Sequence, residues 1–172
     1  MRVRCPQAAR MNRRYSRIRP STEVSLVGGL MYTLITRPDV ATAVSICARY
    51  VQPPREAHLA TAKRILRFLH HTRKTPLVYQ FCGRALDVKA FVDSSWGNDV
   101  DTRRSRFGYA IYVGKSLVAW CSKLHPALAI SSAEAEYTAA TEAVKAIKWI
   151  VSLMTVTPSI RSRSMRITTH VA

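Results

Sequence analysis

The sequence has few acidic residues, and they are unevenly placed. Its 172 residues include 27 lysines and arginines but only 10 aspartates and glutamates, which gives a formal net charge of +17. No acid occurs after Glu142. A chain this basic favours polyanions as partners, because clustered cations gain counterion-release entropy when they bind phosphates. The shortage of acids toward the C-terminus limits any chemistry that needs several carboxylates.

Other absences narrow the classes of protein further. No apolar run is long enough for a membrane span or a signal-peptide core. We therefore expect an intracellular protein, cytoplasmic or nuclear, that is neither secreted nor bound to a membrane. The four cysteines are too scattered for a zinc site, the five histidines show no metal-ligand pairing, and no glycine-rich phosphate loop occurs. Disulfide-rich, zinc-binding and phosphate-loop proteins are thus disfavoured.

Two of the acids stand where a strand is predicted to end and where a helix is predicted to begin. Apolar alternation over residues 86–93 predicts a strand that ends at Asp93. Glu136 lies near the start of a helix predicted from 132 to about 154, on the stripe that continues through Ala140, Ala143, Ile147 and Ile150. An acid on an apolar face needs a partner, and carboxylates suit Mg²⁺ or Mn²⁺. The alternative is that Glu136 is a rim carboxylate that reaches water at the helix N-terminus.

Glu134 has a different expected role. With Ser131 as the N-cap, Glu134 is the third helical residue and completes a capping box. The pattern therefore assigns Glu134 to the start of the helix rather than to catalysis.

Several ordered segments carry a resemblance to a known family. They are FVDSSWG at 91–97, SRFGY at 105–109, WCSK at 120–123 and SSAEAEY at 131–137. In this order and spacing they resemble the ribonuclease H domain of copia-type retrotransposon polyproteins. The upstream segments at 25–32, 37–40 and 62–69 resemble the part of those polyproteins that joins reverse transcriptase to ribonuclease H. The resemblance covers roughly residues 24–154.

The resemblance implies a reaction and roles for the two acids. The implied reaction is hydrolysis of the RNA strand of an RNA/DNA hybrid by two divalent metals, Mg²⁺ or Mn²⁺. Asp93 matches the first catalytic aspartate and Glu136 the catalytic glutamate, both as metal ligands. The family carries its next catalytic aspartate on a strand soon after this helix, but residues 155–164 contain no acid. We therefore expect that strand to be absent and the chain to be inactive.

Two other interpretations stay open beside the inactive nuclease. The chain could be a non-catalytic basic protein that binds nucleic acid through backbone charge alone, or a transposon-derived product with no retained role. The expected partners are an RNA/DNA hybrid or another nucleic acid, together with the other polyprotein domains of an intact element. No membrane partner is expected.

The expected fold class is α/β, a partial ribonuclease H-like fold with a mixed or antiparallel sheet plus a helix, preceded by a small helical segment. Residues 1–23 are predicted to form a basic, disordered arm, 24–75 a helical connecting segment, 76–154 the N-terminal half of the ribonuclease H-like domain, and 155–172 a divergent basic tail. Helices are predicted at 24–35, 39–51 and 55–72, and strands near 77–82, 86–93, 107–113 and 117–121.

Basic residues recur on the helix predicted at 55–72. Lys63, Arg67 and His71 follow one another at intervals of four, so they form a ridge that could track a nucleic-acid backbone or simply be the solvent face. The buried stripe of this helix is predicted to be Leu59, Ala62, Leu66 and Leu69.

The loop after Asp93 combines charges of both signs. Arg103 and Arg104 are candidate nucleic-acid contacts, and Asp99 and Asp101 are expected to be solvated charges that offset them.

Overall fold

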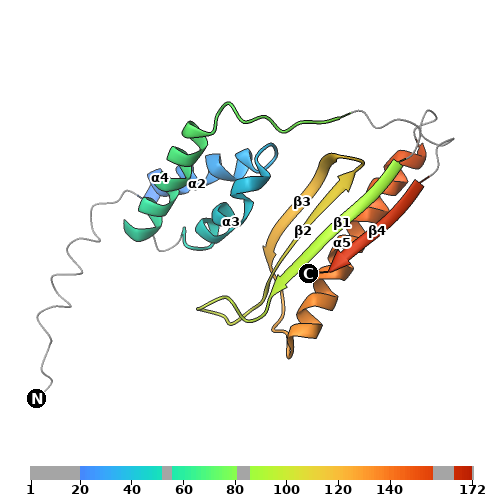
Figure 1. The fold of residues 1–172 in the computed structure, drawn as a ribbon. Helices are drawn as coiled ribbons and strands as arrows, with labels where there is room; N and C mark the ends of the chain where they lie inside the picture. Colours follow the sequence, from blue (N-terminus) through green and yellow to red (C-terminus); the bar gives the residue numbers. More distant parts are fainter. Residues whose placement is uncertain (1–19, 52–55, 81–85, 157–164, 172) are drawn as a thin grey trace, which may run out of the picture. The chain divides into compact units, whose positions relative to one another are not determined.

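The computed structural model describes residues 20–51, 56–80, 86–156 and 165–171 (Figure 1). The chain divides into two compact units, residues 1–76 and 77–172. Within the described ranges, the first unit is helical and the second combines four strands with one long helix. None of the described helices is both long and apolar enough to cross a membrane.

In its described part, the first unit contains the helices α2 (Pro20–Thr33), α3 (Ala41–Arg49) and α4 (Glu56–His71), with the 3₁₀ turn η2 (Pro38–Val40) directly before α3. The helices place apolar side chains three or four residues apart, which gathers them on one face. These side chains form a single buried cluster: Val27, Leu30, Val40, Val44, Cys47, Ala62 and Ile65.

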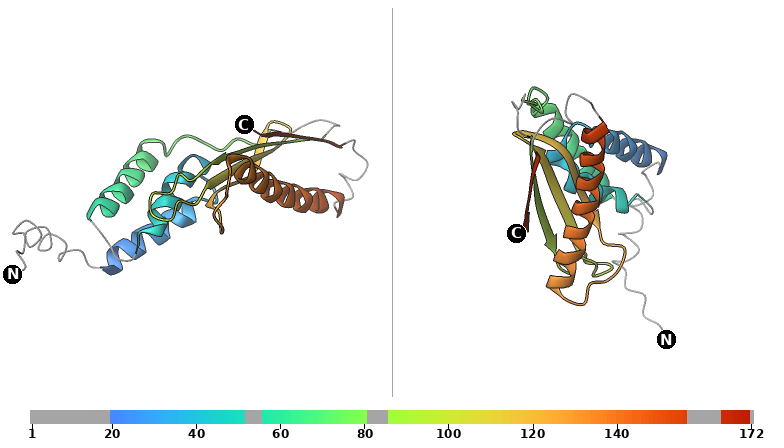
Figure 2. Two further views of the ribbon diagram at one scale, coloured as in Figure 1. Left: turned by 90° about the horizontal axis from the view of Figure 1, so that it is seen from below. Right: turned by 90° about the vertical axis from the view of Figure 1, so that its right-hand side faces the viewer.

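The second unit is a sheet in the order β3-β2-β1-β4, built from β1 (Leu86–Ser95), β2 (Arg106–Val113), β3 (Ser116–Leu124) and β4 (Met165–Val171). The pairs β1–β2 and β2–β3 are antiparallel, whereas β4 is parallel to β1. A parallel strand needs a crossover, and the long helix α5 (Ser132–Val156), between β3 and β4 in the sequence, supplies it. Figure 2 shows α5 lying along one face of the sheet.

The core of this unit lies between the sheet and α5. Val88, Ala90 and Val92 alternate along β1, and each is at most 2% exposed. Ile111 of β2 joins them. The helix contributes one buried stripe: Ala135, Ala139, Ala143, Ile147, Ile150 and Met154. The buried residues alternate along β1 and stand three or four positions apart on α5. Together they form one apolar layer between the strand and the helix.

The α/β class, with a mixed sheet and a preceding helical segment, is confirmed, and the second unit is a partial ribonuclease H-like fold. The prediction of no strand after the long helix is wrong, because β4 follows it. Its sequence alternates β-branched and apolar residues, at Ile167, Thr169 and Val171, which is itself a strand signal.

Three smaller predictions differ from the structure. The strand predicted near 77–82 does not form over 77–80; the backbone of Gln80 bonds the side chain of Ser116, the first residue of β3. On α4 the buried residue is Ile65 rather than Leu66, which is 41% exposed. Of the basic arm predicted over 1–23, residues 20–23 belong to α2, and 1–19 lie outside the described residues.

Candidate functional site

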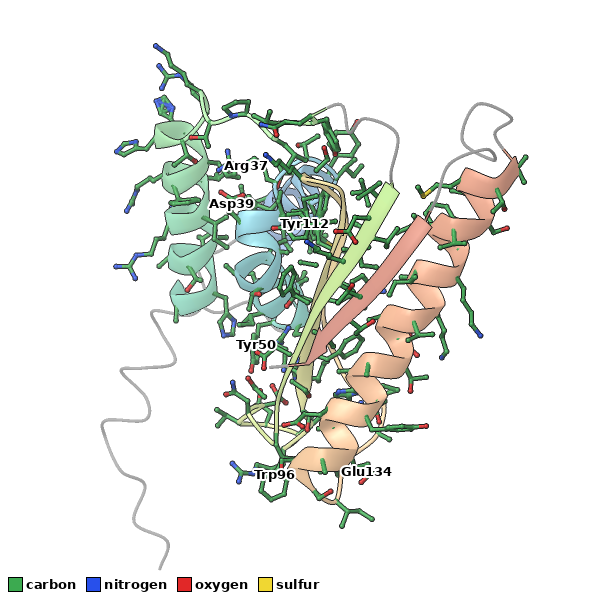
Figure 3. All side chains as sticks on the ribbon, turned by 45° about the vertical axis from the view of Figure 1, so that its right-hand side comes forward. Arg37, Asp39, Tyr50, Trp96, Tyr112 and Glu134 are labelled. Atoms are coloured by element: carbon green, nitrogen blue, oxygen red, sulfur yellow. The ribbon has the colours of Figure 1, made fainter. Side chains whose placement is uncertain are left out.

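The end of β1 and the start of α5 lie at the same end of the second unit. The indole Nε1 of Trp96, which directly follows β1, donates a hydrogen bond to the carbonyl of Ala129 at 3.0 Å. Ala129 stands just before α5, and Figure 3 shows Trp96 and Glu134 at this end of the helix. The elements that carry Asp93 and Glu136 therefore meet here.

His125 is buried and contacts both β1 and α5. The residue is 3% exposed, and its Nε2 lies 3.4 Å from the hydroxyl of Ser94 near the end of β1. The ring also bonds the backbone of Ala135 in α5 and lies 4.6 Å, between centroids, from the ring of Phe107. Burial lowers the pKa of His125, against the opposing effects of the Glu142 charge and the Ala135 bond. A buried imidazole favoured in its neutral form thus links strand and helix.

Asp93 lies at the expected strand end, but its side chain is not under the helix. The residue is exposed, and it alternates with Val92 and Ser94, the first of which packs under α5. Alternation along β1 therefore places the carboxylate on the opposite face of the sheet. Its register partner on β2 is Gly108, so no side chain lies directly opposite Asp93 on that strand.

Glu136 lies at the margin of the buried stripe of α5. Its neighbour Ala135 and the following Ala139 are fully buried, whereas Glu136 and Ala140 are half-buried. The buried stripe therefore runs through Ala139 at the start of the helix, and the predicted burial of Ala140 is incomplete. Glu136 is therefore half-buried at the margin of this stripe, and its role stays a prediction.

The structure places Asp93 and Glu136 at the same end of the second unit, but their side chains do not converge on one position. Asp93 belongs to the sheet face away from α5, and Glu136 belongs to α5 itself. Across the described residues, no group of three or more histidine, cysteine or acidic side chains could hold a metal ion. A Mg²⁺ or Mn²⁺ ion shared by Asp93 and Glu136 stays a prediction.

The start of α5 is held by its own side chains. The hydroxyl of Ser131 accepts a hydrogen bond from the Glu134 amide at 3.1 Å. In return, the Glu134 carboxylate accepts one from the Ile130 amide at 2.6 Å, one residue earlier than in a standard capping box. Glu134 is therefore engaged at the helix terminus.

The loop after β1 is ordered by a buried acid. Asp99 is 8% exposed, and its carboxylate accepts hydrogen bonds from the amide and the hydroxyl of Thr102. Its backbone also bonds Arg103 and Arg104. The expectation that Asp99 is a solvated charge is wrong, because the loop folds back around this carboxylate; Asp101 is exposed. Arg103 is exposed with φ 55°, and Arg104 is half-buried.

The basic residues predicted on α4 share one side of the helix. Lys63, Arg67 and His71 are all exposed. The opposite side carries Ala62 and Ile65, which are buried in the core of the first unit. The interval of four thus places the three basic residues on a solvent-facing surface.

Sequence comparison relates this chain to transposon polyproteins and to a secreted effector protein. The retrovirus-related Pol polyprotein from transposon RE1 of Arabidopsis thaliana is 35% identical over 136 residues, which are 79% of this chain and 9% of the polyprotein. The corresponding polyprotein from transposon TNT 1-94 of Nicotiana tabacum is 39% identical over 127 residues, 73% of this chain and 9% of the polyprotein. Secreted RxLR effector protein 161 of Plasmopara viticola is 37% identical over 128 residues, which are 74% of this chain and 89% of that protein.

These relatives define the class of the protein. The chain spans 9% of the length of the two polyproteins. No family model matches it, and no solved structure matches it significantly. The chain is similar to one segment of the retrovirus-related Pol polyproteins of transposons, which supports its assignment as a retrotransposon Pol fragment.

Proposed function

We propose that this chain is a ribonuclease H-like fragment of a copia-type retrotransposon polyprotein that no longer cleaves RNA/DNA hybrids. Its ancestral reaction is hydrolysis of the RNA strand with two divalent metals. The relatives support the retrotransposon origin, and the ordered motifs around Asp93 and Glu136 support the ribonuclease H assignment.

The loss of activity is inferred from one observation, the absence of acids in β4. This strand runs parallel to β1, and Val171 pairs with Val92, so the two strands end at the same edge of the sheet, next to Asp93. A strand after the long helix is where the family carries its next catalytic aspartate. Neither β4 nor any other position after Glu142 holds an acid.

The remaining acids do not fit a two-metal site. Two adjacent dications are unshielded charge unless several carboxylates bind them. Only Asp93 and Glu136 match catalytic positions of the family, and they lie on opposite sides of the β1 strand layer. Arg103 and Arg104 add positive charge to the neighbouring loop, which repels cations. No metal-dependent step is assigned to these residues.

The test is cleavage of a labelled RNA/DNA hybrid by the purified full chain in Mg²⁺ and in Mn²⁺. An active ribonuclease H serves as the positive control, and a cooperative unfolding transition in tryptophan fluorescence shows that the second unit is folded. We expect the RNA strand to stay intact. Cleavage that disappears in both Asp93→Asn and Glu136→Gln would overturn the proposal.

A further inference from the structure

One face of α2 is apolar and exposed, and we call it the α2 face. It consists of Val24, Gly28, Met31 and Tyr32, with Ile35 in the turn that follows the helix. These positions recur at intervals of three or four residues, which places them on one side of a helix. The four larger side chains are between 44% and 77% exposed, whereas another side of α2 is buried in the helical core. Contiguous exposed apolar side chains of this kind mark an interaction surface.

The packing of the described residues does not require a glycine at the centre of this face. A Cβ added to Gly28 would meet no atom within 4 Å outside its own stretch of helix. Glycine inside a helix destabilises it relative to alanine, so an open position there is a cost without a benefit to the first unit. A missing side chain does allow a second backbone to approach closely. Contact with a partner therefore accounts for Gly28 better than packing within the unit.

The α2 face is uncharged, although the chain has a net charge of +17. No charged side chain occurs from Val24 to Thr36. The next charged residue, Arg37, donates hydrogen bonds to Asp39 at 3.0 and 2.6 Å, which pairs its charge. Two copies of a chain this basic repel each other wherever their cations meet, so a neutral surface is needed to join them. The α2 face meets this requirement, and it offers no cation to a polyanion.

The α2 face is also complementary to itself. In a two-fold interface each contact occurs twice, because residue i meets residue j and residue j meets residue i. If two antiparallel α2 helices cross at Gly28, Val24 of each copy lies opposite Tyr32 of the other, since both are four residues from the crossing. A large side chain then faces a smaller one on each side, and the two glycines meet in the centre.

We propose that the α2 face joins two copies of this chain in a symmetric dimer, with antiparallel α2 helices that cross at Gly28. The interface uses neither Asp93 nor Glu136. The proposal therefore goes beyond the proposed loss of nuclease activity and does not depend on it.

The test is sedimentation equilibrium of the purified full chain over a wide range of protein concentrations. Nuclease treatment during purification removes nucleic acid, and high salt screens the repulsion between copies. We expect the average mass to rise with concentration toward twice that of one chain. Gly28→Leu should weaken the dimer at least about tenfold, because a side chain at the centre of an interface separates the helices there. Circular dichroism checks that its helices persist, as the open position predicts.

Charges at the two ends of the α2 face test the antiparallel register. Val24→Lys/Tyr32→Lys and Val24→Glu/Tyr32→Glu place like charges opposite each other, so each should weaken the dimer at least about tenfold. Val24→Glu/Tyr32→Lys places opposite charges there and should dimerise more tightly than either. The matched control, Val100→Lys/Ile130→Lys, adds two lysines at exposed apolar positions of the second unit and should dimerise like the original chain.

Several results would overturn the proposal. One is a monomer at every concentration, including a chain that associates only before nuclease treatment, since nucleic acid would then join the copies. Another is a dimer that Gly28→Leu leaves intact, or that Val24→Lys/Tyr32→Lys and the matched control weaken equally. If Val24→Glu/Tyr32→Lys dimerised as weakly as the two like-charge variants, the antiparallel crossing at Gly28 would be wrong.

Discussion

The two units of the chain differ in what they bury. The described core of the first unit is apolar throughout, from Val27 to Ile65. The described part of the second unit buries four polar or charged residues: Asp99, Ser105, Ser116 and His125. Buried polar groups cost free energy unless they are hydrogen-bonded, and those of the second unit have partners. The buried core of the first unit is apolar, and its hydrogen bond between Arg37 and Thr72 is only partly buried, whereas the second unit buries polar residues within its core.

Three of these polar residues, Asp99, Ser105 and His125, lie at the end of the second unit where β1 stops and α5 begins, whereas Ser116 lies at the opposite end of the sheet. The hydroxyl of Ser105 accepts from the Gly97 amide at 3.2 Å, and the carbonyl of Ser105 accepts from the His125 amide at 2.8 Å. These bonds use neither Asp93 nor Glu136. The scaffold of the candidate site can therefore persist although the carboxylate set is incomplete. Substitutions in this polar network should change the stability of the second unit and leave that of the first unit unchanged.

The largest expected effect comes from the apolar layer under α5. Ile111 is fully buried, so Ile111→Ala should lower the free energy of unfolding of the second unit by about 2–5 kcal/mol. All three tryptophans, Trp96, Trp120 and Trp149, lie in this unit, so urea unfolding followed by tryptophan fluorescence reports on it. The matched control is Ile130→Ala at a position 89% exposed, with an expected change within about 0.5 kcal/mol. If Ile111→Ala and Ile130→Ala lowered the free energy of unfolding equally, Ile111 would not belong to the core of the second unit.

The buried acid of the β1–β2 loop gives the next largest effect. Asp99→Ala removes the acceptor of the Thr102 amide and hydroxyl, and we expect a loss of about 1–3 kcal/mol by the same fluorescence measurement. Asp101→Ala, at an exposed position two residues away, should change stability by less than about 0.5 kcal/mol. If both substitutions cost the same, the carboxylate of Asp99 does not order the loop.

The cap of α5 should contribute somewhat less. Ser131→Ala removes the acceptor of the Glu134 amide, and we expect it to destabilise the second unit by about 1 kcal/mol. Ser132→Ala changes a neighbouring exposed serine inside the helix and should have little effect. A cost that is equal at both positions would show that Ser131 does not cap the helix.

The smallest expected effect is a pH dependence from His125. Burial lowers its pKa in the folded chain, so the unfolded chain takes up the proton first as the pH falls. The stability that His125 contributes is full above its unfolded pKa of about 6.5 and is lost as the pH falls through the lower folded pKa. The fluorescence midpoint in urea should therefore be lower at pH 5.5 than at pH 7.5. His125→Gln should reduce this difference; an unchanged difference would assign it to other groups.

Much of the fold follows from local patterns in the sequence. The alternation from Val88 to Val92 predicts β1, and the Ser131 and Glu134 spacing predicts where α5 begins. The position of Asp93 at a strand end follows from the same alternation. These features depend on residues close together in the chain, so periodicity and capping rules can find them.

Other features depend on contacts between distant residues. The pairing of β4 with β1 brings Val171 beside Val92, and no local pattern specifies a partner 79 positions away in the chain. The roles of Asp99 and His125 depend on how the loops close around them. The burial of Ile65 instead of Leu66 is set by the direction from which α2 and α3 approach α4. Tertiary packing decides each of these cases.

The most direct measurement combines binding and cleavage of one labelled RNA/DNA hybrid by the full chain in Mg²⁺ and Mn²⁺. Anisotropy first records binding, and a denaturing gel of the same sample then records the length of the RNA. We predict that the hybrid is bound and that its RNA strand remains intact. Metal-dependent shortening of the RNA that is lost in Asp93→Asn would contradict the claim that this ribonuclease H-like fragment is inactive.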